Sequence, residues 1–435
     1  VFVSAVAKDP WDYGKVKYRF KVDEGEWTKY SDNNTLISPK ILDEGVHRVQ
    51  VQSRDSQGNV DPTPAEVRFT VHTKELRVVK IEDGQFQRIF PSQYLRYQKV
   101  GLGRVKVENT RKKPVKVNIE LKIEDLFERP ATTSVSLGAS ESRWVDLKAP
   151  FSDKVLANEG RRPVQVVVEA RYTWEEVERS TRKSFEVELL DAAAFVWDKP
   201  LRLGAFINSR DPLVQKLAAD LYRTFAEKHP QQAKSAHPLR NYMLAMYTFE
   251  ALDELGVQYK PDPERPFSSL SSGALDTVQY PSQTLLRRTG DCDDLTVLFA
   301  SLLENLNVPT AVLPVEGHVF MMFDSGVRVE NRVAFPVDAR KTVEREGWLW
   351  VPVETTVLGK AGDFEAAWSR GAQNFRGKHR PGKKQIVLVR DAWREYPPAT
   401  RPLPGKKIKT PRLAAAAGSA SRLLEGYGKR VAAKA

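Results

Sequence analysis

Three residues that lie far apart in the 435-residue chain have the types needed for thiol-dependent acyl transfer. Cys292, the only cysteine, lies in the segment TGDCDD at residues 289–294. His318 follows a Glu-Gly turn, and Glu354 follows the segment WLWVPV. A thiolate can attack a carbonyl carbon, a histidine can move the proton, and a carboxylate can fix the imidazole tautomer. We therefore take these three residues as a candidate catalytic triad.

The residues that follow Cys292 predict the helix that positions it. Asp291 is a typical N-cap, and Asp294 completes a capping box three residues later. The cysteine then lies in the first helical turn, where the helix dipole favours a thiolate, although the neighbouring aspartates raise its pKa. Activation therefore needs a cationic partner, for which His318 is the candidate. Apolar residues at helical spacing predict that the helix packs on a core: Leu295, Leu298, Phe299, Leu302, Leu303 and Leu306.

Alternating patterns predict the strands that carry the other two side chains. The segment HVFMMF places His318 as the first residue of a strand, at the edge of the core rather than within it. The segment WLWVPV places Glu354 where a strand gives way to a loop, a usual place for a catalytic group on a rigid element. Asp338, in the segment FPVD, is the alternative acid.

Acyl transfer also needs hydrogen-bond donors for the oxyanion of the tetrahedral intermediate. The backbone N–H of Cys292 is one candidate, and the side chain of Gln279 or Gln283 is the other.

We expect no cofactor and no metal. A calcium site at Asp55, Asn59 and Asp61 competes with a polar turn, and we favour the turn because short polar side chains cap turns without an ion. The remaining histidines show no metal-ligand spacing: His47, His72, His229, His237 and His379.

Residues 276–358 resemble the transglutaminase-like superfamily, a branch of the papain-like cysteine enzymes. Four segments carry the resemblance in the family's order: YPSQTL, RTGDCDD, GHVF and WVPVET. It implies a nucleophilic thiolate at Cys292, a general base and acid at His318, and an orienting carboxylate at Glu354. Many members of the family have aspartate at the last position, whereas this chain has glutamate.

The patterns before residue 193 predict two β modules. Residues 1–72 contain alternating segments at 15–22, 46–51 and 67–71 with turn-forming residues between them. The segments GEWT, EGVH and DSQGNVDPTPA make this part resemble the immunoglobulin-like modules of large bacterial surface and envelope proteins. Residues 73–192 predict a second β-sandwich and contain no recognisable chemistry. The fold class that we expect is therefore multidomain: two all-β immunoglobulin-like sandwiches followed by an α+β transglutaminase-like (papain-like) domain.

The catalytic domain is predicted at residues 193–396, where helical spacing comes first and strand patterns follow. A proline-rich basic linker is expected at 397–411, and the start of a helical segment at 412–435. Since the chain starts inside a strand pattern and ends in an alanine-rich segment, we expect a fragment of a longer chain.

The net charge of +12 is concentrated near the C-terminus. Residues 371–435 contain 16 Lys and Arg against 3 Asp and Glu, whereas the first 370 residues contain 52 against 53. A basic tail can meet an anionic surface, and the lack of interleaved aromatic residues argues against specific nucleic-acid binding. No apolar run is long enough for a transmembrane segment, and one cysteine excludes a disulfide scaffold.

Together these features predict a cysteine peptidase or amidase that acts on protein or cell-envelope peptides through a Cys-His-Glu triad and an acyl-enzyme. Two alternatives remain open: a transamidase with the same triad, in which an amine resolves the acyl-enzyme, and an inactive transglutaminase-like binding or assembly module. The localisation is not encoded in the sequence, although the immunoglobulin-like modules favour an envelope-associated or extracytoplasmic protein.

Overall fold

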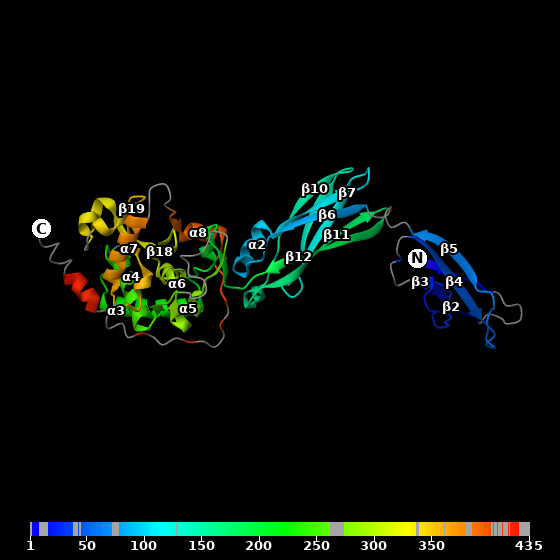
Figure 1. Cartoon of the computed structure of the whole chain (residues 1–435), viewed down its shortest axis with the longest axis horizontal. Coiled ribbons are helices and arrows are strands. Elements are labelled where there is room, and N and C mark those ends of the chain that lie inside the picture. The colour runs from blue at the N-terminus through cyan, green and yellow to red at the C-terminus, as the bar shows by residue number, and fades with distance from the viewer. Residues whose placement is uncertain are drawn as a thin grey trace.

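The computed structural model shows a multidomain protein in which two β-rich parts precede a part that combines helices and sheets (Figure 1). The structure describes residues 2–7, 16–37, 42, 45–71, 78–127, 129–235, 237–261, 274–335, 339–360, 362–378, 385–401, 403, 407, 411, 416 and 418–425. None of the helices within these ranges is both long and apolar enough to cross a membrane.

The N-terminal part is a small β module with a thin core. Its antiparallel sheet has the order β2-β4-β5, and β1 pairs with β3. The three segments whose alternation predicts strands coincide with β2, β4 and β5. Tyr18, Phe20 and Val49 are the buried apolar residues of its core. The strands are β1 (Phe2–Ser4), β2 (Lys17–Val22), β3 (Thr35–Ile37), β4 (Gly45–Arg54) and β5 (Ala65–Val71).

Asp55 closes the turn after β4 in this module. Its carboxylate accepts the backbone N–H groups of Gln57 and Asn59 at 3.0 and 2.7 Å and the side-chain amide of Asn59 at 2.7 Å. These bonds within the turn account for the polar spacing that also allowed a calcium site.

The middle part consists of two antiparallel sheets that share one apolar core. One sheet has the order β10-β7-β6 and the other β12-β11-β8-β9. Alternation along β8 buries Val115, Val117, Ile119 and Leu121, as expected for strands with one face on a core. The elements are β6 (Val79–Phe86), α2 (Tyr94–Val100), β7 (Gly103–Asn109), β8 (Val115–Lys122), β9 (Ala131–Leu137), β10 (Ser142–Leu147), β11 (Arg162–Trp174) and β12 (Val177–Leu189), with short 3-10 helices η1 (Pro91–Gln93) and η2 (Asp153–Ala157).

The C-terminal part surrounds a five-stranded antiparallel sheet with the order β19-β20-β18-β17-β21. Its helices are α3 (Pro212–Lys228), α4 (Arg240–Glu254), α5 (Pro281–Arg287), α6 (Cys292–Asn305), α7 (Phe364–Lys378) and α8 (Val389–Glu395). Its longer strands are β17 (Thr310–Val315), β18 (His318–Arg328) and β20 (Trp348–Val353). Its shorter strands are β13 (Ala194–Val196), β14 (Gln258–Tyr259), β15 (Leu275–Thr277), β16 (Thr289–Gly290), β19 (Val343–Arg345) and β21 (Val387–Leu388). Its 3-10 helices are η3 (Pro200–Ala205), η5 (Val329–Ala334), η6 (Ala339–Lys341) and η7 (Thr355–Val357).

Helix α6 forms the centre of this domain. The apolar stripe predicted after Cys292 is buried along the whole helix. Leu213, Leu217, Leu221 and Phe225, whose helical spacing predicts α3, are buried as well. Leu295, Leu298 and Leu302 belong to the same apolar cluster as Val319 and Val353 of the central sheet. Burial of this stripe, rather than the intrinsic helix propensity of the sequence, fixes the start of α6 against the sheet.

The middle and C-terminal parts touch each other through charged and aromatic side chains. The guanidinium of Arg96 lies 4.9 Å from the ring centroid of Tyr396 and 3.6 Å from Glu395, and that of Arg202 lies over Phe90. The backbone carbonyl of Ala399 accepts an amide N–H of Asn208 at 3.0 Å. The first residues of the predicted linker at 397–411 are therefore attached to the folded body. The domain boundaries themselves stay predictions.

Candidate active site

The capping box predicted at the start of α6 is present and places Cys292 in the first turn. Asp291 accepts the backbone N–H groups of Asp293 and Asp294 at 3.2 and 3.4 Å, and Asp294 accepts the N–H of Asp291 at 3.3 Å. At Gly290 an added Cβ would lie 2.6 Å from the Cβ of Asp294. Only glycine therefore lets the chain approach the cap this closely before entering the helix.

His318 and Glu354 meet because two neighbouring antiparallel strands bring their ends together. His318 is the first residue of β18, Glu354 follows the last residue of β20, and Met321 pairs with Val353 in the ladder. The imidazole Nε2 lies 2.7 Å from Glu354 Oε2. This bond leaves Nδ1 as the ring nitrogen that can exchange a proton with another group.

The thiol of Cys292 lies beside the strand that begins with His318. Its sulfur accepts a hydrogen bond from the backbone N–H of Val319, the residue after the histidine. Only 4% of the Cys292 surface is exposed. Among the residues that the structure describes, no hydrogen bond joins the thiol directly to the imidazole.

Electrostatics keep the resting thiol protonated. Burial is the largest cause that raises the pKa of Cys292, and the charges of Asp291 and Glu354 raise it further. The N–H of Val319 acts in the opposite direction and is outweighed. A proton acceptor must therefore take the thiol proton when a substrate arrives, and His318, the first residue of the strand beside the thiol, is the candidate of the right type.

Glu354 is buried but is supplied with hydrogen-bond donors on both oxygens. Oε2 accepts His318 and the Asn374 amide, the latter at 2.6 Å, while Oε1 accepts the N–H and hydroxyl of Thr356 at 3.2 and 2.8 Å. Burial would raise the pKa of Glu354, but the bonds and charge from His318 together with the bonds from Thr356 outweigh it, and the pKa is lowered. The carboxylate is therefore ionised and held in one orientation.

Two of these contacts were not anticipated from the sequence. Thr356 follows the acid by two residues, and this local spacing is the signature of a side chain that caps its own turn, so a pattern search could have found it. Asn374 lies 20 residues later, in α7, where nothing in its local sequence distinguishes it from a surface residue. Only the packing of α7 against β20 reveals it.

The three aspartates that surround Cys292 each offer an oxygen, and these oxygens lie within 4.8 Å of one another. Such a cluster could hold a cation, but the cap bonds already use Asp291 and Asp294. Asp293 is fully buried and neither of its oxygens has a hydrogen-bond partner among the described residues. Burial and the charge of Asp291 raise the pKa of Asp293 well above its usual value, so a proton can neutralise it without a metal.

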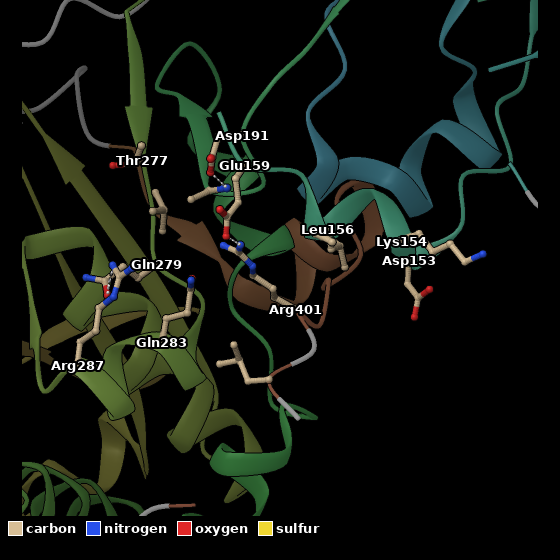
Figure 2. Close-up of a pocket in the computed structure, with 14 residues that line it drawn as sticks. Asp153, Lys154, Leu156, Glu159, Asp191, Thr277, Gln279, Gln283, Arg287 and Arg401 are labelled. Atoms are coloured by element: carbon tan, nitrogen blue, oxygen red, sulfur yellow. Dashed lines mark hydrogen bonds and ion pairs between the residues drawn. The ribbon is translucent and has the colours of Figure 1, made fainter. Parts of the chain in front are cut away.

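Gln279 and Gln283, the expected oxyanion donors, line a pocket to which Cys292 does not contribute. Both line a pocket of about 840 Å³ between the middle and C-terminal parts, to which Asp153 and Arg401 also contribute and Cys292 does not (Figure 2).

Contacts of the two amides explain this placement. The side-chain amide of Gln279 donates to Asp294 and to the Thr289 carbonyl, and its backbone N–H donates to Asp294 at 2.7 Å. The oxygen of Gln283 accepts the N–H of Tyr280 at 3.0 Å to cap α5. Gln279 therefore supports the α6 cap, and the oxygen of Gln283 caps its own helix, while a role of either glutamine at the oxyanion stays a prediction.

Two further site predictions concern the alternative acid and the backbone N–H of Cys292. Asp338, the alternative acid, lies outside the described residues. The backbone N–H of Cys292 opens α6 and has no acceptor among the described residues, so it stays available as an oxyanion donor.

Comparison with known proteins gives little support for any assignment. No family model matches the chain, and no curated protein matches it. Among solved structures, the crystal structure of the Y1175G mutant of Salmonella alpha-2-macroglobulin is similar over 65% of this chain and 17% of that chain, with 13% identity and a TM-score of 0.21. This chain thus spans less than one fifth of that protein, and so low a TM-score carries no conclusion about fold or activity.

Proposed function

We propose that the C-terminal part is a transglutaminase-like, papain-like cysteine enzyme that cleaves amide bonds in protein or cell-envelope peptides. The observation that carries the proposal is the 2.7 Å hydrogen bond between His318 Nε2 and Glu354 Oε2. It lies at the start of β18, the strand beside the Cys292 thiol. Order and type of the three residues, nucleophile then base then carboxylate, agree with the resemblance in the sequence.

The geometry suits a sequence of two acyl transfers. His318 Nδ1 takes the proton of Cys292 as the sulfur attacks the carbonyl carbon, and Glu354 stabilises the imidazolium that forms. The same histidine then returns the proton to the leaving amine and an acyl-thioester remains. Water, activated by the histidine in turn, hydrolyses the thioester and regenerates the enzyme.

The two β-rich parts are proposed to be immunoglobulin-like modules that position this domain in a bacterial cell envelope. Their support is the antiparallel sheet pairing and the segments that resemble such modules in the sequence. In the described residues of these parts we find no nucleophile paired with a base. They are therefore assigned positioning rather than chemistry.

One observation favours a second candidate function, an inactive binding or assembly module. The thiol is almost completely buried and its pKa is raised, both of which are typical of structural cysteines. The two candidates differ in whether Cys292 can be acylated.

A burst experiment tests the proposal. The full chain is mixed with p-nitrophenyl acetate, and the release of p-nitrophenolate and the acetylation of Cys292 are followed by absorbance and intact-protein mass spectrometry. We expect one acetyl group on the wild type, none on Cys292→Ala, and strongly slowed acetylation of His318→Ala. His237→Ala, which removes a half-buried histidine of the same domain, is the matched control. Acetylation that is equally fast in His318→Ala would assign the inactive module instead.

A further inference from the structure

Among the described residues, acidic and basic side chains line the pocket between the middle and C-terminal parts in equal numbers. Its volume of about 840 Å³ falls within the roughly 300–1,000 Å³ that is usual for small-molecule sites. The charged side chains come from η2 and the loop after it, the segment that joins the two parts, α5 and the segment after α8: Asp153, Lys154, Glu159, Asp191, Arg287 and Arg401. A cavity with both signs of charge suits a ligand that carries both.

Hydrogen bonds to the main chain fix the walls of this pocket. On the side of η2, the N–H of Ala192 donates to the Asn158 carbonyl at 3.1 Å. On the side of β15, the N–H of Val278 donates to the Ala193 carbonyl at 2.9 Å. The Tyr280 hydroxyl, at the start of α5, donates to the Ala192 carbonyl at 2.9 Å. The pocket is therefore formed before a ligand arrives, as is usual for ligand sites.

Arg401 brings into this pocket a guanidinium that has few acceptors. Its side chain is only 15% exposed, and its one ion pair among the described residues is with Glu159, at 3.5 Å. Glu159 is itself 85% exposed, so solvent screens the pair and weakens it. A guanidinium has five N–H donors, and burial makes unused donors costly. A carboxylate that enters the pocket can therefore displace Glu159 and bind Arg401 through two parallel hydrogen bonds.

A second donor enters the pocket from α5. Gln283 uses its side-chain oxygen to cap that helix. Its Nε2 has no partner among the described residues, and Figure 2 shows this nitrogen pointing away from α5 into the pocket that Arg401 also lines. A carboxylate between the two side chains would receive donors from both.

The acids of the pocket make a simple anion a poor ligand. Asp191 is held by the backbone N–H groups of Gly160 and Ala193, which donate to its two oxygens at 2.7 and 2.8 Å. Each oxygen keeps a lone pair that can accept an ammonium group. An inorganic phosphate at Arg401 would meet the like charges of Asp191 and Glu159, whereas a zwitterion can place its own cation beside them.

We propose that this pocket binds the end of a short peptide, with the C-terminal carboxylate at Arg401 and Gln283 and the ammonium group at Asp191. Leu156, Val278 and Leu403 line the same space and suit small apolar side chains of the peptide. Because Cys292 does not line the pocket, a peptide bound here is held away from the nucleophile. The inference rests on the proposed function, whose substrates and products belong to this class.

Calorimetric titration of the full chain with tetra-alanine tests the proposal, with Cys292→Ala introduced so that the peptide is not cleaved. N-acetylated and C-terminally amidated tetra-alanine are the matched control ligands, and they test each charge without altering the protein. We expect saturable binding of the free peptide. Each blocked peptide should bind at least about tenfold more weakly, because each loses hydrogen bonds between charged groups.

Two variants separate the pocket from the ion pair that crosses it. Arg401→Gln removes the guanidinium and should weaken binding of tetra-alanine at least about tenfold. Glu159→Gln breaks the same ion pair but keeps the guanidinium and removes its competitor. It should therefore bind the peptide as tightly as the parent chain or more tightly.

The outcomes that overturn the proposal are distinct. Equal losses in Arg401→Gln and Glu159→Gln would assign the ion pair a structural role in joining the two parts. Unchanged binding in Arg401→Gln, or no saturable binding of tetra-alanine, would remove the peptide from this pocket. Equally tight binding of the acetylated peptide would rule out the zwitterionic ligand. None of these results depends on acylation of Cys292, which the burst experiment measures, so a failure here is separate from a failure of the proposed function.

Discussion

Buried carboxyl groups lie on two elements beside the Cys292 thiol, Glu354 after β20 and the aspartates in the first turn of α6. The pKa values of Glu354 and Asp293 are shifted in opposite directions. Glu354, at the end of β20, has donors on both oxygens and a lowered pKa, whereas Asp293, in the first turn of α6, has no partner among the described residues and a raised pKa. Both side chains are at most 2% exposed. At Glu354 the donors and the charge of His318 outweigh burial, whereas nothing outweighs burial at Asp293, so depth alone does not decide the charge of these two carboxyl groups.

This difference assigns the two sets different roles. A carboxylate that is ionised and held by several donors can orient an imidazole and stabilise its cation. Asp291 acts in the opposite way, because its negative charge beside the thiol disfavours the thiolate and raises the pKa of Cys292. The site therefore combines a carboxylate that promotes the chemistry through His318 with a negative charge at Asp291 that keeps the thiol protonated until a proton acceptor acts.

The largest effect on the acetylation rate is expected at Glu354. Glu354→Gln keeps the shape of the side chain and removes its charge, so His318 loses the charged acceptor that fixes its tautomer and stabilises its cation. Loss of such a carboxylate costs up to about 10⁴ in rate. The acetylation rate of Cys292 measures the effect. Glu316→Gln, in the turn just before His318, is the control, and a variant at position 354 that retains most of the wild-type rate would transfer the orienting role to another group.

A smaller loss is expected when Glu354 keeps its charge and loses one donor. Asn374→Ala removes the 2.6 Å bond to Oε2, and a hydrogen bond to a charged group is worth roughly tenfold in rate or more. Asn374→Asp adds a like charge instead. It should raise the pKa of Glu354 and move the acid limb of the pH–rate profile to higher pH.

The shift of the acid limb separates this role from simple packing. Gln373→Ala, on the exposed neighbouring position of α7, should leave rate and profile unchanged. If Asn374→Asp lowered the rate without moving the acid limb, Asn374 would serve the fold of α7 rather than the charge of Glu354.

Local patterns predicted the parts of the site that are encoded within a few residues. The capping box before Cys292, the strand start at His318 and the strand end at Glu354 each depend on neighbours in the chain, and the structure has all three. The strands of the two β modules and the helical start of the C-terminal part were predicted for the same reason. Whether the domains belong to the families that the sequence resembles stays a prediction.

Contacts between distant segments could not be read from the chain. Asn374 reaches Glu354 only because α7 packs on β20. The contacts of Gln279 and Gln283 could not be anticipated either, because their closeness to Cys292 in sequence does not determine where their amides point. Their bonds to Asp294 and Tyr280 depend on the turn between β15 and α5.

The charge of Asp291 gives the next prediction, an increase in the reactivity of Cys292 rather than a loss. Asp291→Asn keeps a side chain that caps helices as well as aspartate and removes a negative charge beside the thiol. The pKa of Cys292 should fall, and one pKa unit corresponds to about tenfold more thiolate at neutral pH. Iodoacetamide alkylation at fixed pH measures this, with Asp220→Asn as the control. An unchanged alkylation rate, with an unchanged melting temperature, would mean that burial alone restrains the thiol.

The smallest effect on rate, and a distinct effect on stability, is expected at Asp294. Burial and the charge of Asp291 raise its pKa to about 7, although bonds from Gln279 and Asp291 oppose the shift. A carboxyl group with a raised pKa binds its proton more tightly in the folded state. Its contribution to stability is therefore present at low pH and is lost as the pH rises from about 4, its usual pKa, to about 7.

The test of this sign uses Cys292 itself as the reporter of unfolding. Wild type and Asp294→Asn are equilibrated with urea at about pH 5 and about pH 8, and the exposed thiol is then read by a brief labelling pulse at one common pH. Each pKa unit between the folded and unfolded states is worth about 1.4 kcal/mol, so the wild type should need less urea at the higher pH. Asparagine cannot ionise, and the variant should lose most of this difference, whereas Asp153→Asn should keep it. A wild type equally stable at both pH values would show that Asp294 stays ionised in the fold, supported by Gln279 as Glu354 is by Asn374, and the contrast between the two sets of carboxyl groups would then be confined to Asp293.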